Sequence, residues 1–132
     1  MSKVATEVAQ QEFERWAETF EIDISTDAFD PEELKAFDGF KAKFIKRIET
    51  GALTIDDDGV IEFSPRGDDG DPLKFDEPTG ALLSARQKND TEIQAARRVL
   101  ASWTGVAPKR FAEMKLRDFN FCSELLAFFG NS

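Results

Sequence analysis

The chain has 132 residues and a formal charge of −9, from 26 acidic and 17 basic side chains, and it contains no histidine. This length fits one domain with a modest core, and the acidic surface disfavours binding to nucleic-acid phosphates and anionic membranes. With Cys122 as its single cysteine, the sequence excludes zinc sites and Cys–His nucleophiles. It shows no other catalytic constellation or phosphate-binding loop, so we expect neither an enzyme nor a cofactor.

Phenylalanine is unusually common, with 13 Phe, two Trp and no Tyr. Rings without a polar group are expected mainly in a core or on a binding surface. The first residues lack the apolar run of a signal peptide. No apolar run approaches the ~20 residues of a membrane span. A cytoplasmic protein is therefore expected.

The first helix is predicted over residues 3–20, where Ala9, Phe13, Trp16 and Phe20 share one face. After it, residues 21–25 alternate in polarity, which is typical of either a short strand or an extended connector.

The second helix is predicted to begin at Asp30, whose carboxylate can accept a free backbone N–H, with Pro31 at the first helical position. Phe37, Phe40 and Phe44 lie on its apolar face, and Gly51 favours a left-handed cap at its end. Gly39 interrupts the helix at a cost of about 1 kcal/mol relative to alanine. Either close packing or simple tolerance explains this glycine.

A β-hairpin is predicted from residues 52–55 and 60–63, which flank an acidic turn ending in Gly59. Residues 73–75 form a third extended run that would stabilise the hairpin. The turn resembles part of a calcium-binding loop, but Pro65 stands where the bidentate glutamate is needed. A solvated hairpin turn is therefore favoured over a calcium site.

The last third is predicted to be helical. One helix runs from Thr79 to about Arg86, and a second restarts with a capping-box pattern near Thr91 and ends at Gly105. Pro108 begins a short helix, and the last helix spans about residues 117–129. The buried face of the helix before Gly105 is predicted to contain Ile93, Ala96, Val99, Leu100 and Trp103.

The last helix carries two adjacent apolar stripes that together cover about 180 degrees. One stripe contains Phe119, Cys122, Leu126 and Phe129, and the other contains Phe121, Leu125 and Phe128. Two interpretations stay open: this is a central core helix covered on both sides, or one stripe faces a partner or a second copy. The candidate partner-binding residues are Phe119, Phe121, Leu125, Phe128 and Phe129.

These elements predict a mostly helical α+β fold in one domain, residues 1–132. It would comprise an N-terminal helical region (1–50), a β-hairpin or three-stranded antiparallel sheet (52–76) and a C-terminal helical bundle (78–130).

The order of motifs in the C-terminal half resembles the tail assembly chaperones of tailed bacteriophages over about residues 60–129. The matching parts are a short strand leading to Pro78-Thr79, a helix from Asn89 to Trp103, a Thr-Gly turn before Pro108, the element Leu116-Arg117-Asp118, and a closing helix containing Leu125-Leu126. The first 50 residues lie outside the resemblance.

The resemblance implies a nonenzymatic helper that binds the tape-measure protein, and often tail-tube subunits, before the tail is built. It also implies that a longer form is often produced by ribosomal frameshifting. In that role an apolar helix surface would contact the tape-measure protein, while the acidic surface keeps the complex in solution.

Two alternatives stay open. An acidic inhibitor or nucleic-acid mimic would use clusters such as residues 56–58 and 68–71, and a structural tail or neck subunit would form stable oligomers. Self-association of the chaperone itself is also left open.

Overall fold

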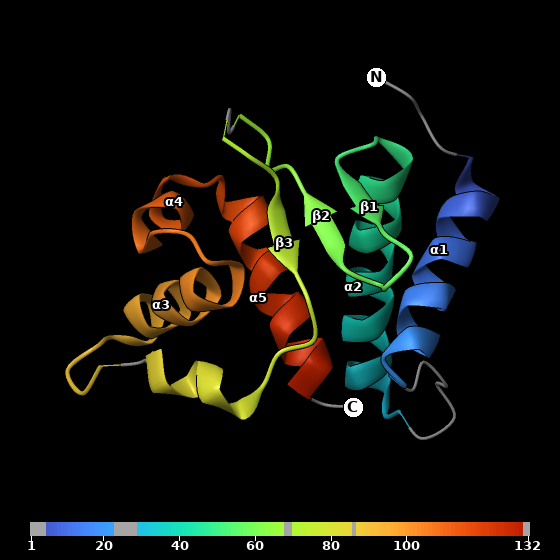
Figure 1. Cartoon of the computed structure of the whole chain (residues 1–132). Coiled ribbons are helices and arrows are strands. Elements are labelled where there is room, and N and C mark those ends of the chain that lie inside the picture. Colours follow the sequence, from blue (N-terminus) through green and yellow to red (C-terminus); the bar gives the residue numbers. More distant parts are fainter. Residues whose placement is uncertain (1–4, 23–28, 68–69, 86, 131–132) are drawn as a thin grey trace.

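The computed structural model describes residues 5–22, 29–67, 70–85 and 87–130. Its elements, shown in Figure 1, are α1 (Thr6–Thr19), α2 (Pro31–Glu49), β1 (Leu53–Ile55), β2 (Ile61–Phe63), β3 (Leu73–Phe75), the 3-10 helix η1 (Gly80–Ala85), α3 (Glu92–Thr104), α4 (Pro108–Glu113) and α5 (Leu116–Gly130). This arrangement confirms the predicted mostly helical α+β fold.

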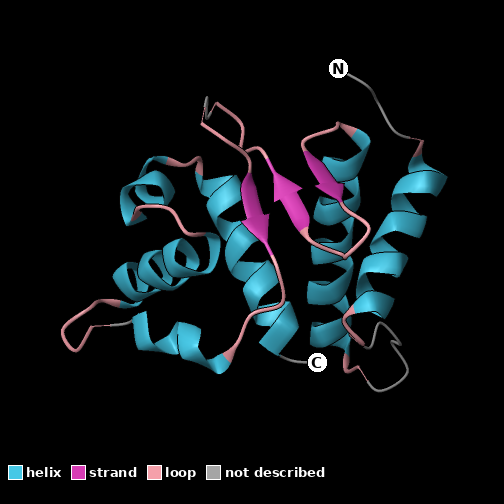
Figure 2. Cartoon of the chain, in the orientation of Figure 1, coloured by secondary structure: helices cyan, strands magenta, loops and turns pink. Residues whose placement is uncertain are grey.

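The three strands form an antiparallel sheet in the order β1-β2-β3. Leu53 pairs with Phe63, which pairs with Leu73, so these three buried side chains project to the same face. Figure 2 shows the sheet in front of α2 and α5, with α1 on one side and α3 and α4 on the other. The predicted hairpin and its third strand are both confirmed.

The ends of α2 follow the predicted chemistry. The backbone N–H of Glu33 donates to Asp30 Oδ1 at 2.8 Å, Pro31 occupies the first turn, and Gly51 has φ = 82°. A Cβ added at Gly39 would have nothing within 4 Å, so packing within the described chain does not explain this glycine. Of the predicted strand or connector after α1, residues 23–25 lie outside the described part.

The helix predicted after Thr79 is present as the 3-10 helix η1, in which the Leu82 N–H donates to the Thr79 carbonyl three residues back. The buried face predicted for α3 was wrong in detail. The capping box of α3 is confirmed at Thr91 and Gln94, but its buried face is rotated, since Ile93 is 48% exposed. The small side chains of Ala95 and Ala101 allow close packing on the buried face instead. The buried residues of α3 are Ala95, Val99, Leu100, Ala101 and Trp103.

The core extends from α1 to α5 and is rich in aromatic rings. Phe121 of α5 lies 5.8 Å from the Phe40 ring of α2 and 5.5 Å from the Phe63 ring of β2, measured between centroids. On the other side of α5, Trp103 of α3 approaches Phe129 at 5.8 Å. Helix α5 is therefore covered by α2, the sheet and α3 together.

Candidate protein-binding groove

The five residues predicted to contact a partner divide into two groups. Phe121 and Leu125 have no exposed surface, whereas Phe119, Phe128 and Phe129 are half-buried. Phe121 and Leu125 therefore present no surface to a partner in this structure. These two residues instead pack inside the fold, as the alternative of a central core helix predicts.

Phe129 is held by aromatic rings from two other helices. Its ring lies 5.3 Å from Trp16 and 5.4 Å from Phe20 at the end of α1, and Trp103 of α3 approaches it from another element. Phe119 packs against the core at the opposite end of α5. These contacts give both residues a role inside the fold.

Phe128 lines an open groove of 1020 Å³ between α2 and α5. Its ring is stacked on Phe37 at 5.7 Å and on Phe40 at 4.8 Å. Phe37 and Phe40 are buried, at 7% and 5% exposure, so the half-buried Phe128 is the ring of this cluster that faces the groove. The remaining lining residues are Ile22, Phe29, Glu32, Glu33, Lys35, Ala36, Gly39, Lys43, Glu124 and Ala127.

Small residues make this groove accessible along both helices. Ala36 and Gly39 on α2, and Ala127 on α5, are exposed while lining it. Lys43 Nζ lies 2.8 Å from Glu124 Oε1 and joins the two helices by an ion pair. An open apolar groove between two helices is a common docking site for an amphipathic helix.

Acidic groups gather where α2 begins. Glu32 and Glu33 line the groove there, next to Asp30. The nearby Asp30 carboxylate raises the pKa of Glu33, because two close negative charges repel. A cationic side chain on a bound segment would relieve that repulsion.

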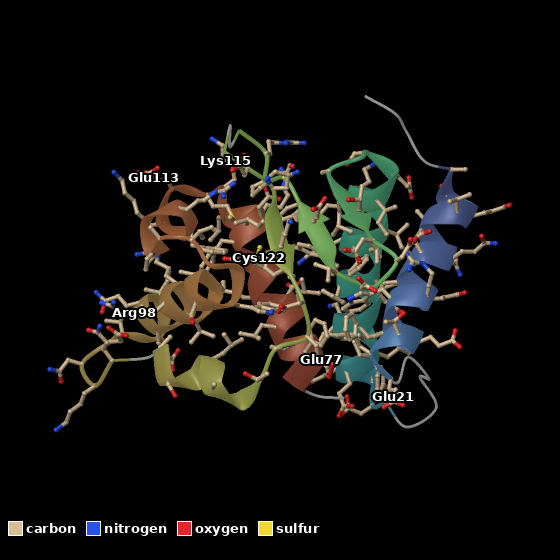
Figure 3. The ribbon with its side chains drawn as sticks, in the orientation of Figure 1. Glu21, Glu77, Arg98, Glu113, Lys115 and Cys122 are labelled. Atoms are coloured by element: carbon tan, nitrogen blue, oxygen red, sulfur yellow. The ribbon has the colours of Figure 1, made fainter. Side chains whose placement is uncertain are left out.

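A second, smaller hollow of 580 Å³ lies beside α4 and is lined by Arg66, Lys109 and Lys115, among others. Figure 3 shows Glu113 and Lys115 near α4, on the side of the molecule away from α1. Lys109 is paired with Glu113 at 3.6 Å, and Arg110 donates to the Asp71 carbonyl oxygen. Two of the cationic side chains beside this smaller hollow thus already have partners within the chain. The hollow also lacks the aromatic lining of the groove between α2 and α5.

Neither Cys122 nor the acidic hairpin turn has the geometry of a reactive site. Figure 3 shows Cys122 in the interior, and burial raises the pKa of its thiol. Asp56 Oδ1 accepts the backbone N–H groups of Asp58 and Val60 at 2.9 Å, which fixes the turn. Among the described residues, no group of three or more His, Cys, Asp or Glu is placed to hold a metal ion.

The α2 wall of the groove was not predicted as a binding surface. One sequence signal could have indicated it, namely Gly39, a glycine within an otherwise regular amphipathic helix, which the structure shows to be exposed. The periodicity of the apolar residues placed Phe37 and Phe40 on α2's inner face, where they are buried, but did not show that a groove would remain between α2 and α5.

Comparison of the chain with protein-family models, with curated proteins and with solved structures finds no match. Over the described residues, no helix combines the length and apolar character needed to cross a membrane. The geometry of the groove is therefore the main evidence that bears on function.

Proposed function

We propose that this protein is a nonenzymatic phage tail assembly chaperone that binds helical segments of the tape-measure protein through the groove between α2 and α5. Tail-tube subunits would be further clients. The observation that carries the proposal is the groove itself, in which the half-buried Phe128 lies on the buried rings of Phe37 and Phe40, beside exposed small residues.

The chemistry of the groove supports binding of an amphipathic helix. Apolar side chains of the client would cover the partly exposed Phe128, and the exposed Ala36, Gly39 and Ala127 would let its backbone approach. The acidic start of α2 and the net charge of −9 favour clients with basic flanking residues. The resemblance of residues 60–129 to tail assembly chaperones supplies the identity of the client.

The acidic-mimic alternative receives less support. Such a protein presents its carboxylates to a basic groove of the target, but Asp56 is bonded within its own turn. No arrangement in the described residues specifically favours a structural tail or neck subunit.

Co-expression with the tape-measure protein of the same genome tests the proposal. A soluble complex is expected with the native chain, and Ala127→Glu should abolish it because a carboxylate would enter the apolar groove at an exposed position. Ala112→Glu, at an exposed alanine of α4 outside the groove, should leave the complex intact. Equal melting temperatures would show that both variants are folded. Absence of a native complex, or its survival in Ala127→Glu, would contradict the proposal.

A further inference from the structure

Charge is distributed unevenly along the exposed side of α2. Glu32 lies in the first turn and Lys46 in the last turn, and both are exposed. Among the described residues, neither belongs to an ion pair. This polarity complements the helix dipole. The two ends of the helix therefore carry opposite charges, as pairing with an antiparallel copy would require.

Gly39 lies at the centre of this arrangement. It follows Glu32 by seven residues and precedes Lys46 by seven residues. Seven residues make about two helical turns, so the three positions lie along one stripe of the helix. A two-fold axis passing beside Gly39 would therefore place Glu32 of one chain opposite Lys46 of another.

The groove runs beside that stripe. Glu32, Ala36 and Gly39 belong both to the exposed side of α2 and to the groove lining. A Cβ at Gly39 would meet nothing within 4 Å, so the position has room for an approaching backbone. The half-buried Phe128, the small residues at the crossing point and the opposite charges at the two ends of α2 together form one surface.

From this surface we infer that a second copy of the chain covers the groove: α2 packs antiparallel on α2 of the second copy across a two-fold axis at Gly39. Each α2 then lies along the other copy's groove, beside α5. The interface is isologous and contains two Glu32–Lys46 pairs. Together, α2 and α5 of both copies form a four-helix arrangement in which Gly39 allows the two α2 helices to approach closely.

This pairing also gives Gly39 a physical role. Within one chain, a mid-helix glycine weakens α2 and gains no packing in return. Against a second copy, the absence of a side chain lets the helices cross closely enough to bury the exposed Ala36 and Ala127 and the remaining exposed part of Phe128. The glycine is therefore explained by an intermolecular contact.

The consequence for regulation rests on the proposed function. If the groove binds a client helix, the second copy occupies the same surface and shields it until a client displaces it. Dimerisation itself needs no client and can be measured on the protein alone. A dimer without a tape-measure complex would contradict the proposed function only, and a complex without a dimer would contradict this inference only.

Sedimentation equilibrium of the full chain over a range of concentrations tests the inference. The native protein should approach twice the 14.8 kDa mass of one chain. Gly39→Gln should raise the dimer dissociation constant by about tenfold or more, since the added side chain separates the helices. Gly80→Gln is the matched control, because Gly80 is likewise exposed and a Cβ there would also have nothing within 4 Å.

Charge reversal then tests the orientation. Glu32→Lys and Lys46→Glu should each weaken the dimer at low salt, and the loss should shrink as salt is added. The double variant restores both pairs in a two-fold dimer and should recover nearly native association. A monomer at all concentrations, an unchanged dimer in Gly39→Gln, or a double variant weaker than both single variants would overturn the inference.

Discussion

The guanidinium of Arg47 and the carboxylate of Asp118 lie 3.0 Å apart, between Nη2 and Oδ1, with only 10% and 8% of their side chains exposed. Asp118 Oδ2 also accepts the backbone N–H of Arg66 at 2.9 Å, and the guanidinium lies 4.4 Å from the Phe121 ring centroid. One buried ion pair thus joins α2, the loop after β2 and the first turn of α5. Asp118 is additionally favoured by its place at a helix N-terminus.

Removing the carboxylate should destabilise the fold strongly. In Asp118→Ala the Arg47 charge stays buried without its partner, a change that typically costs about 3–5 kcal/mol. Urea denaturation followed by circular dichroism measures the loss. A change below about 1 kcal/mol would show that the pair is hydrated or dispensable.

The double replacement Arg47→Met with Asp118→Leu should cost less than the sum of the two single changes, because no unpaired charge remains buried. Lys74 and Glu62 provide the surface control, with their charged atoms 3.7 Å apart and their side chains 69% and 44% exposed. Breaking that exposed pair by Lys74→Gln should change stability by less than about 1 kcal/mol. Additive losses at Arg47 and Asp118 would contradict a coupled pair.

Phe121 and Phe119 should respond differently to truncation, although both are aromatic residues of α5. Phe121 has no exposed surface and touches rings from α2 and β2, so Phe121→Ala should cost about 3–5 kcal/mol. Phe119 is half-buried, so Phe119→Ala should cost clearly less. Thermal or urea unfolding compares them directly. Equal losses would argue that Phe119 is as deeply packed as Phe121.

Local chemistry allowed much of this fold to be predicted. The Asp30 cap, the glycine at the end of α2 and the Thr91 capping box act through bonds within a few residues, so the sequence alone revealed them. The acidic turn and its flanking β-prone runs likewise predicted the hairpin. These features depend little on how the elements pack together.

Features that depend on packing were harder to predict. The Arg47–Asp118 pair joins residues 71 positions apart, and the pattern of charges does not distinguish it from the many exposed ones. Periodicity gave α5 two apolar stripes, but only the placement of α2, the sheet and α3 decides which rings are enclosed. For the same reason, the partial exposure of Phe128 and the groove beside it could not be foreseen from helix patterns.

Cys122 should resist thiol reagents while the protein is folded. Burial, assisted by the nearby Asp118 carboxylate, raises the pKa of its thiol, and the opposing effect of Arg47 is smaller. Alkylation by iodoacetamide, followed by mass spectrometry, should be slower than in 8 M urea by on the order of a thousandfold. An added Ala112→Cys provides the control, because its thiol would occupy an exposed position and react in the folded state.

The same shift gives a pH dependence of stability. Above about pH 8.5 the unfolded thiol loses its proton while the folded thiol keeps it, so this group's contribution to stability falls as pH rises. Cys122→Ala should remove that part of the decline, even if the truncation lowers stability at every pH. An identical alkaline decline in both proteins would assign it to other groups.

Gly39 and Gly59 should respond in opposite directions to alanine. Gly39→Ala improves helix propensity without meeting any atom within 4 Å, so the isolated fold should gain up to about 1 kcal/mol. At Gly59, φ is +86° and an added Cβ would lie 2.9 Å from Thr19 Cγ2 at the end of α1. Gly59→Ala therefore combines backbone strain with a steric clash and should cost more than about 1 kcal/mol. Urea unfolding at a protein concentration low enough to keep the chains monomeric measures both. A loss at Gly39 under those conditions would place a packing constraint on it inside the single chain, and a neutral Gly59→Ala would mean that the hairpin turn moves away from α1 without cost.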